Sequence, residues 1–139
     1  MLVDVIMDAL KYLEKYRGIK PKELANNREL LGSILWHLYV VVQGSIDLAL
    51  RIISKLKLRT PKSYADAFKI LEESGIISTE LSKKLIDMAR FRHILAHVYF
   101  SINVNVICEI LKKNLYDIRE YITSISKELR KRGIDITEI

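Results

Sequence analysis

Cysteine, proline and glycine are scarce in this chain, with one, two and five residues among 139. The lone Cys108 cannot form a disulfide within the chain, and inside an apolar run it is typical of a small buried hydrophobe. So few turn residues cannot supply the many tight turns of a β-sandwich or barrel. The composition therefore favours helices, and the free cysteine fits a reducing cytoplasm.

We also expect no signal peptide and no membrane span. Asp4 and Asp8 interrupt the apolar N-terminal run, which a signal peptide would not tolerate. Polar side chains also interrupt the most apolar stretch, residues 34–53; they are His37, Gln43, Ser45 and Asp47. This pattern favours a helix buried by protein over one surrounded by lipid. The sequence therefore predicts a cytoplasmic protein without a membrane contact.

Apolar residues recur at helical spacing almost throughout the chain, and half of all residues are hydrophobic. The expected helices cover residues 2–13, 28–57, 63–73, 78 or 79 into the nineties, and 103 or 105 onward to a basic end closed at Gly133. The sequence thus predicts an all-α fold, an antiparallel bundle of about five helices in one domain spanning residues 1–139. The second helix is apolar on more than one face, so we expect a homodimer that buries the remainder.

The segment RFRHILAHVYF, residues 90–100, places two arginines, two histidines and a tyrosine in an apolar setting. His93 and His97 have the four-residue spacing of a zinc-binding H-E-x-x-H helix, but Ile94 stands where the glutamate would be. No nearby cysteine or carboxylate completes a ligand set, since the closest acid is Asp87. A metal site is therefore disfavoured, and we expect no cofactor.

Arginine, histidine and tyrosine without acids suit an anionic ligand, as does the formal net charge of +6. Arginine can grip phosphate oxygens, and histidine can move a proton near neutral pH. These groups could cleave RNA without a metal, with the 2′-hydroxyl as nucleophile. On one ideal helix Arg92 and His97 would point about 140° apart. They could then share a site only if the helix ends between them or a second chain contributes.

The spacing of Arg92, His97 and Tyr99 resembles the R-x4-H-x-Y motif of HepT-like proteins, a family of the HEPN superfamily. Two further segments resemble that family: VVQGSIDLA at residues 41–49, and TPKSYADAFKILEESGIIS at residues 60–78. Three such segments in order are far more specific than an R-x4-H pattern alone.

The resemblance implies an all-α dimer with the motifs of two subunits facing one cleft. It implies the toxin of a toxin–antitoxin system, a metal-independent endoribonuclease with tRNA as one candidate substrate. Arg92 and His97 would be catalytic. A nucleotidyltransferase antitoxin of the MntA type would silence the toxin by adding AMP to Tyr99, which puts bulk and negative charge into the cleft.

The family usually has asparagine after the motif arginine, where this chain has His93. This departure keeps a second interpretation open, a non-catalytic helical module that binds nucleotide or docks the nucleotidyltransferase. His93 and Arg90 are predicted to be accessory or RNA-binding residues. Arg90 could hold RNA phosphate or a core-facing carboxylate such as that of Asp87.

Overall fold

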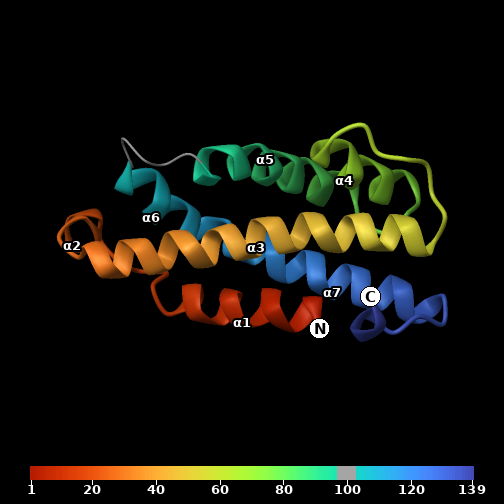
Figure 1. Ribbon diagram of the computed structural model, residues 1–139, viewed down its shortest axis with the longest axis horizontal. Helices are drawn as coiled ribbons and strands as arrows, with labels where there is room; N and C mark the ends of the chain where they lie inside the picture. Colours follow the sequence, from red (N-terminus) through yellow and green to blue (C-terminus); the bar gives the residue numbers. More distant parts are fainter. Residues whose placement is uncertain (97–102) are drawn as a thin grey trace.

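The long helix α3 (Arg28–Lys55) runs along the whole molecule, and the other helices pack around it (Figure 1). This computed structural model describes residues 1–96 and 103–139, and of Ala96 only the backbone. The other elements are α1 (Leu2–Glu14), α2 (Pro21–Ala25), α4 (Tyr64–Glu73), α5 (Thr79–Ala96), α6 (Val104–Lys113), α7 (Leu115–Lys131) and the 3₁₀ turn η1 (Ile136–Glu138). No strand occurs in the described ranges, so the expected all-α fold is confirmed.

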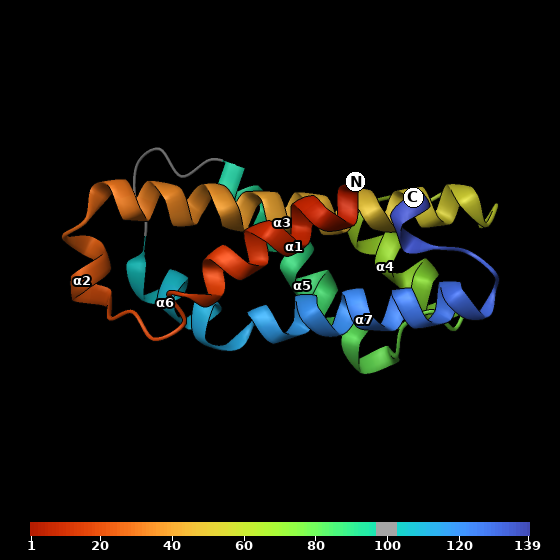
Figure 2. The same ribbon diagram turned by 90° about the horizontal axis from the view of Figure 1, so that it is seen from below.

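The four helices α1, α3, α5 and α7 form the body of the bundle, and the shorter α4 lies beside α5. In Figure 1, α1 lies below α3, while α4 and α5 lie above it. Figure 2 shows α7 on the opposite side of the molecule from α3, with α1 and α5 between them. Each of these four helices runs antiparallel to its neighbours in the bundle. Helix α3 contacts α1, α4 and α5 directly.

The described residues contain seven α-helices rather than about five. The five-residue helix α2 was not among the expected helices; it begins at Pro21, a position where the missing N–H of proline costs nothing. The expected fifth helix is two helices that meet at Asn114. Its apolar residues continue at helical spacing across Asn114, so the periodicity does not show the break.

Side-chain caps explain where most of the predicted helices begin. Asn27, Ser63 and Ser78 each accept a hydrogen bond from a backbone N–H three residues later, at the starts of α3, α4 and α5. Asn103 does the same two residues on, before α6. The caps select Ser78 over Thr79 and Asn103 over Asn105, the alternatives that the sequence left open for the starts of α5 and α6.

The core lies between α3 and the helices around it, and two contacts fix α3 closely. A Cβ added to Gly44 would lie 2.7 Å from Cγ1 of Ile6, so α1 and α3 approach at a point that only glycine permits. The fully buried Tyr121 of α7 donates its hydroxyl to the Ser45 carbonyl at 2.9 Å and packs edge-on against Phe68. Cys108 is buried as expected, and burial raises the pKa of its thiol.

By length and composition α3 could cross a membrane, but half of its most apolar window is packed inside the bundle. Core helices of soluble proteins have the same properties. The polar interruptions seen in the sequence face protein: His37 stacks on Tyr12 at 3.9 Å, and its Nδ1–H donates to the Ser33 carbonyl at 2.6 Å. Both contacts lie within the chain, so this imidazole packs inside the bundle with a hydrogen-bond partner.

Candidate functional site

Arg92 lies half-buried on α5 and reaches across to α3. Its Nε–H donates a hydrogen bond to Oε1 of Gln43, 2.6 Å away. Among the residues described, the terminal nitrogens Nη1 and Nη2 have no hydrogen-bond acceptor. A guanidinium with its inner N–H occupied and its outer fork open can bind phosphate oxygens in pairs.

Gln43 is held in turn by Asp47. Nε2 of Gln43 donates to Oδ1 of Asp47 at 2.9 Å, one helical turn further along α3. Their four-residue spacing places both side chains on one face of the helix. In the structure the pair faces Arg92 of the same chain.

Tyr64, the first residue of α4, supplies the second contact to Arg92. The Arg92 Cζ lies 5.4 Å from the centroid of the Tyr64 ring, a cation–π distance. Gln43 and Tyr64 were not predicted as site residues. The available signal was an i, i+4 polar pair in the middle of an apolar helix, and a tyrosine next to a helix cap.

The start of α4 is fixed by local contacts, which in turn place Tyr64. Asp66 accepts from the Lys62 N–H at 2.9 Å and from both terminal nitrogens of Arg59, at 2.8 and 2.9 Å. These hydrogen bonds to Arg59 and Lys62 lower the pKa of Asp66 to about 2. Arg59 also binds Glu73 at the far end of α4, and both carboxylates raise the pKa of its guanidinium. Arg59, in the loop before α4, therefore binds carboxylates in both the first and the last turn of this helix.

Arg90 and His93, the predicted accessory residues, both lie on the exposed side of α5. Arg90 pairs with Asp87 at 3.5 Å, but both side chains are more than 70% exposed, at 73% and 78%. Asp87 therefore does not face the core as suggested from the sequence. An ion pair this exposed contributes little and leaves Arg90 able to contact a phosphate.

The predicted catalytic His97 and the predicted AMP acceptor Tyr99 lie outside the described residues. Their roles therefore stay predictions. The structure describes α5 up to Ala96, and Arg92 lies one turn before that point.

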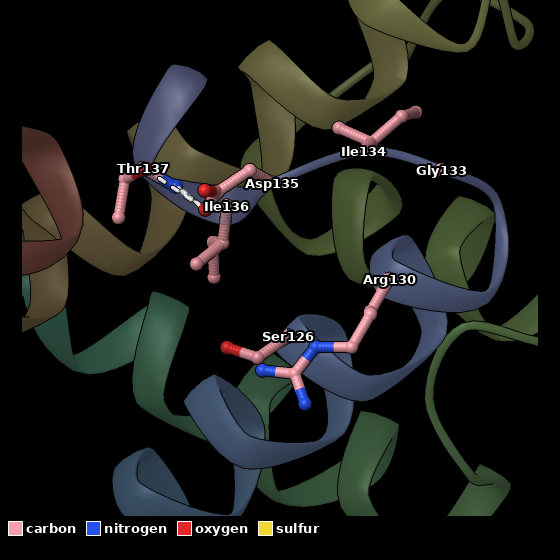
Figure 3. Close-up of a pocket in the computed structure, with 7 residues that line it drawn as sticks. All are labelled: Ser126, Arg130, Gly133, Ile134, Asp135, Ile136 and Thr137. Atoms are coloured by element: carbon pink, nitrogen blue, oxygen red, sulfur yellow. Dashed lines mark hydrogen bonds between the residues drawn. The ribbon is translucent and has the colours of Figure 1, made fainter.

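The described ranges also contain a hollow away from Arg92, but no cluster of metal ligands. No group of three or more histidine, cysteine or acidic side chains there could hold a metal. A hollow of about 470 Å³ lies beside η1, where Arg130 and Ser126 face the C-terminal segment (Figure 3). Asp135 in this hollow already accepts hydrogen bonds from the backbone N–H and the hydroxyl of Thr137. Further along the segment, the backbone oxygen of Ile139 accepts a hydrogen bond from Arg51, near the end of α3. This hollow shares no residue with the Arg92 cluster.

The fold and the cluster define an all-helical protein with a half-buried arginine whose terminal nitrogens could bind an anion. The chain belongs to the ribonuclease HepT-like family, whose model matches residues 6–125. The mRNA nuclease HepT of Shewanella oneidensis is 28% identical over 99 residues, which cover 71% of this chain and 74% of that protein.

Solved structures agree in fold. A crystal structure of a toxin–antitoxin with AMP-PNP matches with a TM-score of 0.82 at 23% identity, over 91% of this chain and 95% of that one. A tri-AMPylated HEPN toxin of Shewanella oneidensis, in complex with an MNT antitoxin, matches with a TM-score of 0.80 at 23% identity. The match covers 91% of this chain and 94% of that toxin. At this identity the likeness is one of fold.

Proposed function

We propose that this protein is the toxin of a toxin–antitoxin system and a metal-independent endoribonuclease that acts on RNA in the cytoplasm. Membership of the ribonuclease HepT-like family, over residues 6–125, is the observation that carries the proposal. The positioned Arg92 and the basic net charge support it. The whole chain, residues 1–139, would form one HepT-like domain.

Cleavage would proceed through attack of the ribose 2′-hydroxyl on the adjacent phosphorus. His97 would take the hydroxyl proton or give one to the leaving 5′-oxygen, and Arg92 would bind the phosphorane oxygens as negative charge builds on them. The products would be a 2′,3′-cyclic phosphate and a 5′-hydroxyl. Arg90 and His93, both exposed near Arg92 on α5, would contact neighbouring phosphates.

An MntA-type nucleotidyltransferase would be the antitoxin, silencing the toxin by transferring AMP to the Tyr99 hydroxyl. Each AMP adds a negatively charged phosphate beside a site built to bind phosphate, so it would compete with RNA for Arg92. Co-expression with the nucleotidyltransferase should raise the intact mass by whole AMP groups, and Tyr99→Phe should abolish the increase. An unchanged increase in Tyr99→Phe would contradict this acceptor.

We also propose that the active form is a homodimer that uses α3. Trp36 of α3 is 62% exposed and Ile94 of α5 is 57% exposed, both unusual for large apolar side chains. A hollow of about 380 Å³ between these helices is lined by Gly32, Leu35, Trp36, Tyr39 and Leu95. Sedimentation should show a dimer at micromolar concentration, and Trp36→Glu should shift it toward monomer. A wild-type monomer would contradict the proposal.

The decisive experiment is digestion of tRNA and of mRNA in excess EDTA, comparing the wild type with His97→Ala. Intact mass must first show that Tyr99 carries no AMP. Wild-type fragments ending in 2′,3′-cyclic phosphate, with none from His97→Ala, would support a metal-free ribonuclease with His97 in its site.

Equal cleavage by both proteins would exclude His97 as the catalytic acid or base. Intact RNA from an unmodified wild type that still binds nucleotide or the nucleotidyltransferase would favour the binding module, the interpretation that His93 in place of asparagine keeps open. His93→Asn then tests whether the histidine is the cause of the missing cleavage, because it restores the family residue at an exposed position without altering the core.

A further inference from the structure

Three side chains form a continuous chain of hydrogen bonds from the middle of α3 to the end of α5. The carboxylate of Asp47 accepts from Nε2 of Gln43 at 2.9 Å, and Oε1 of Gln43 accepts from Nε of Arg92 at 2.6 Å. All three side chains are half-buried, so water competes with these bonds less than it would at the surface.

The two outer groups determine which way the Gln43 amide points. An ionised carboxylate can only accept hydrogen bonds and a guanidinium can only donate them. The amide therefore satisfies both neighbours in one orientation, with its nitrogen toward Asp47 and its oxygen toward Arg92. The flipped amide would place N–H against N–H and oxygen against oxygen, and both hydrogen bonds would be lost.

The backbone that carries Gln43 is also firmly placed. The neighbouring Val42 and Gly44 are buried, and α1 approaches Gly44 so closely that a Cβ would lie 2.7 Å from Ile6. A side chain anchored on such a segment has little freedom to follow a moving arginine. The anchor therefore limits where the Arg92 guanidinium can lie.

We infer that Gln43 and Asp47 are positioning residues that hold Arg92 for phosphate, with Asp47 acting through the Gln43 amide. The inference rests on the proposed ribonuclease function. Gln43 occupies Nε and leaves Nη1 and Nη2, which have no acceptor in the described part of the chain, for the non-bridging oxygens of RNA. Neither positioning residue takes part in bond making or breaking.

Cleavage kinetics of the full chain test the inference, with variants that exchange the amide of Gln43 and the carboxylate of Asp47. Gln43→Ala should lower kcat by roughly 10- to 100-fold with little change in KM, because misplacing a catalytic group weakens contacts made in the transition state. Gln43→Glu should be comparably impaired, since it puts a carboxylate against the Asp47 carboxylate. The double variant Gln43→Glu with Asp47→Asn restores a donor facing an acceptor at each contact, and most of kcat should return.

Asp8→Asn, an exposed change on α1, is the matched control for the acid-to-amide substitution and should leave kcat unchanged. Thermal unfolding of each variant shows whether it is folded. A double variant that folds but is no more active than Gln43→Glu would overturn the inference. Its recovery would support a hydrogen-bond role, because the substitutions leave side-chain size nearly unchanged.

A second measurement does not depend on cleavage. The Nε–H of Arg92, assigned by its loss in Arg92→Lys, should exchange slowly with water in the NMR spectrum of the wild type and rapidly in Gln43→Ala. Equal exchange in both proteins would overturn the inference. If the unmodified wild type cleaves no RNA, the proposed function fails, and this NMR comparison still decides whether Gln43 holds Arg92.

Discussion

Replacing Tyr64 by alanine removes the aromatic face that lies 5.4 Å from the Arg92 guanidinium carbon. Tyr64 is 41% exposed, so water screens the contact, and an exposed cation–π pair contributes about 0.5–1 kcal/mol. If this free energy serves to place Arg92 in the transition state, kcat/KM should fall by about two- to fivefold, since 1.36 kcal/mol corresponds to tenfold. The Ser63 cap and the Asp66 contacts of α4 are untouched, so the melting temperature should change little.

Initial rates on a short RNA, measured with intact-mass control of AMP addition, provide the assay. Tyr64→Phe is the matched variant, because it keeps the ring and removes only the hydroxyl. It should retain wild-type kcat/KM. A loss in Tyr64→Phe as large as in Tyr64→Ala would show that the hydroxyl matters and would refute the cation–π reasoning, as would full activity in Tyr64→Ala.

Two further predictions concern the bundle. Tyr121→Phe deletes the buried hydroxyl that donates to the Ser45 carbonyl at 2.9 Å, and urea unfolding should show a loss of about 1 kcal/mol; no loss would mean the hydrogen bond adds nothing net. The hydrogen bond and charge of Arg119 hold the pKa of Glu14 below its usual 4.5, so this ion pair stabilises the fold at neutral pH and its contribution is lost as the pH falls through the lowered pKa. Because Arg119 is 43% exposed, Glu14→Gln should lower the free energy of unfolding by only about 0.5–1 kcal/mol at pH 7. The difference in unfolding free energy between wild type and variant should shrink below pH 4.5, and a difference that stays constant with pH would contradict this role of the ion pair.

Local signals in the sequence predicted most helix boundaries. Ser63 and Asn103 start helices because their side chains accept backbone N–H groups within two or three residues, a contact that needs no tertiary structure. Similarly, Gly75 and Gly133 end helices with positive φ angles of 74° and 76°, which glycine adopts without strain. The break at Asn114 had no such signal, because the apolar spacing continues through it.

The R-x4-H-x-Y spacing indicated Arg92 as a site residue from the sequence alone. It could not indicate what holds Arg92. Gln43 lies 49 residues before it, and Tyr64 lies 28 residues before it on a different helix. Both lie in segments that resemble the family, but neither segment indicates that its side chain contacts Arg92.

The sequence by itself predicted most of the helices, the family resemblance and Arg92 as a candidate site residue, because caps, periodicity and motif spacing are properties of neighbouring residues. Only the tertiary structure decided that the polar pair on α3 and the first tyrosine of α4 meet at Arg92 on α5. That meeting depends on how three helices pack, and packing is set by the shapes of buried side chains along their whole lengths.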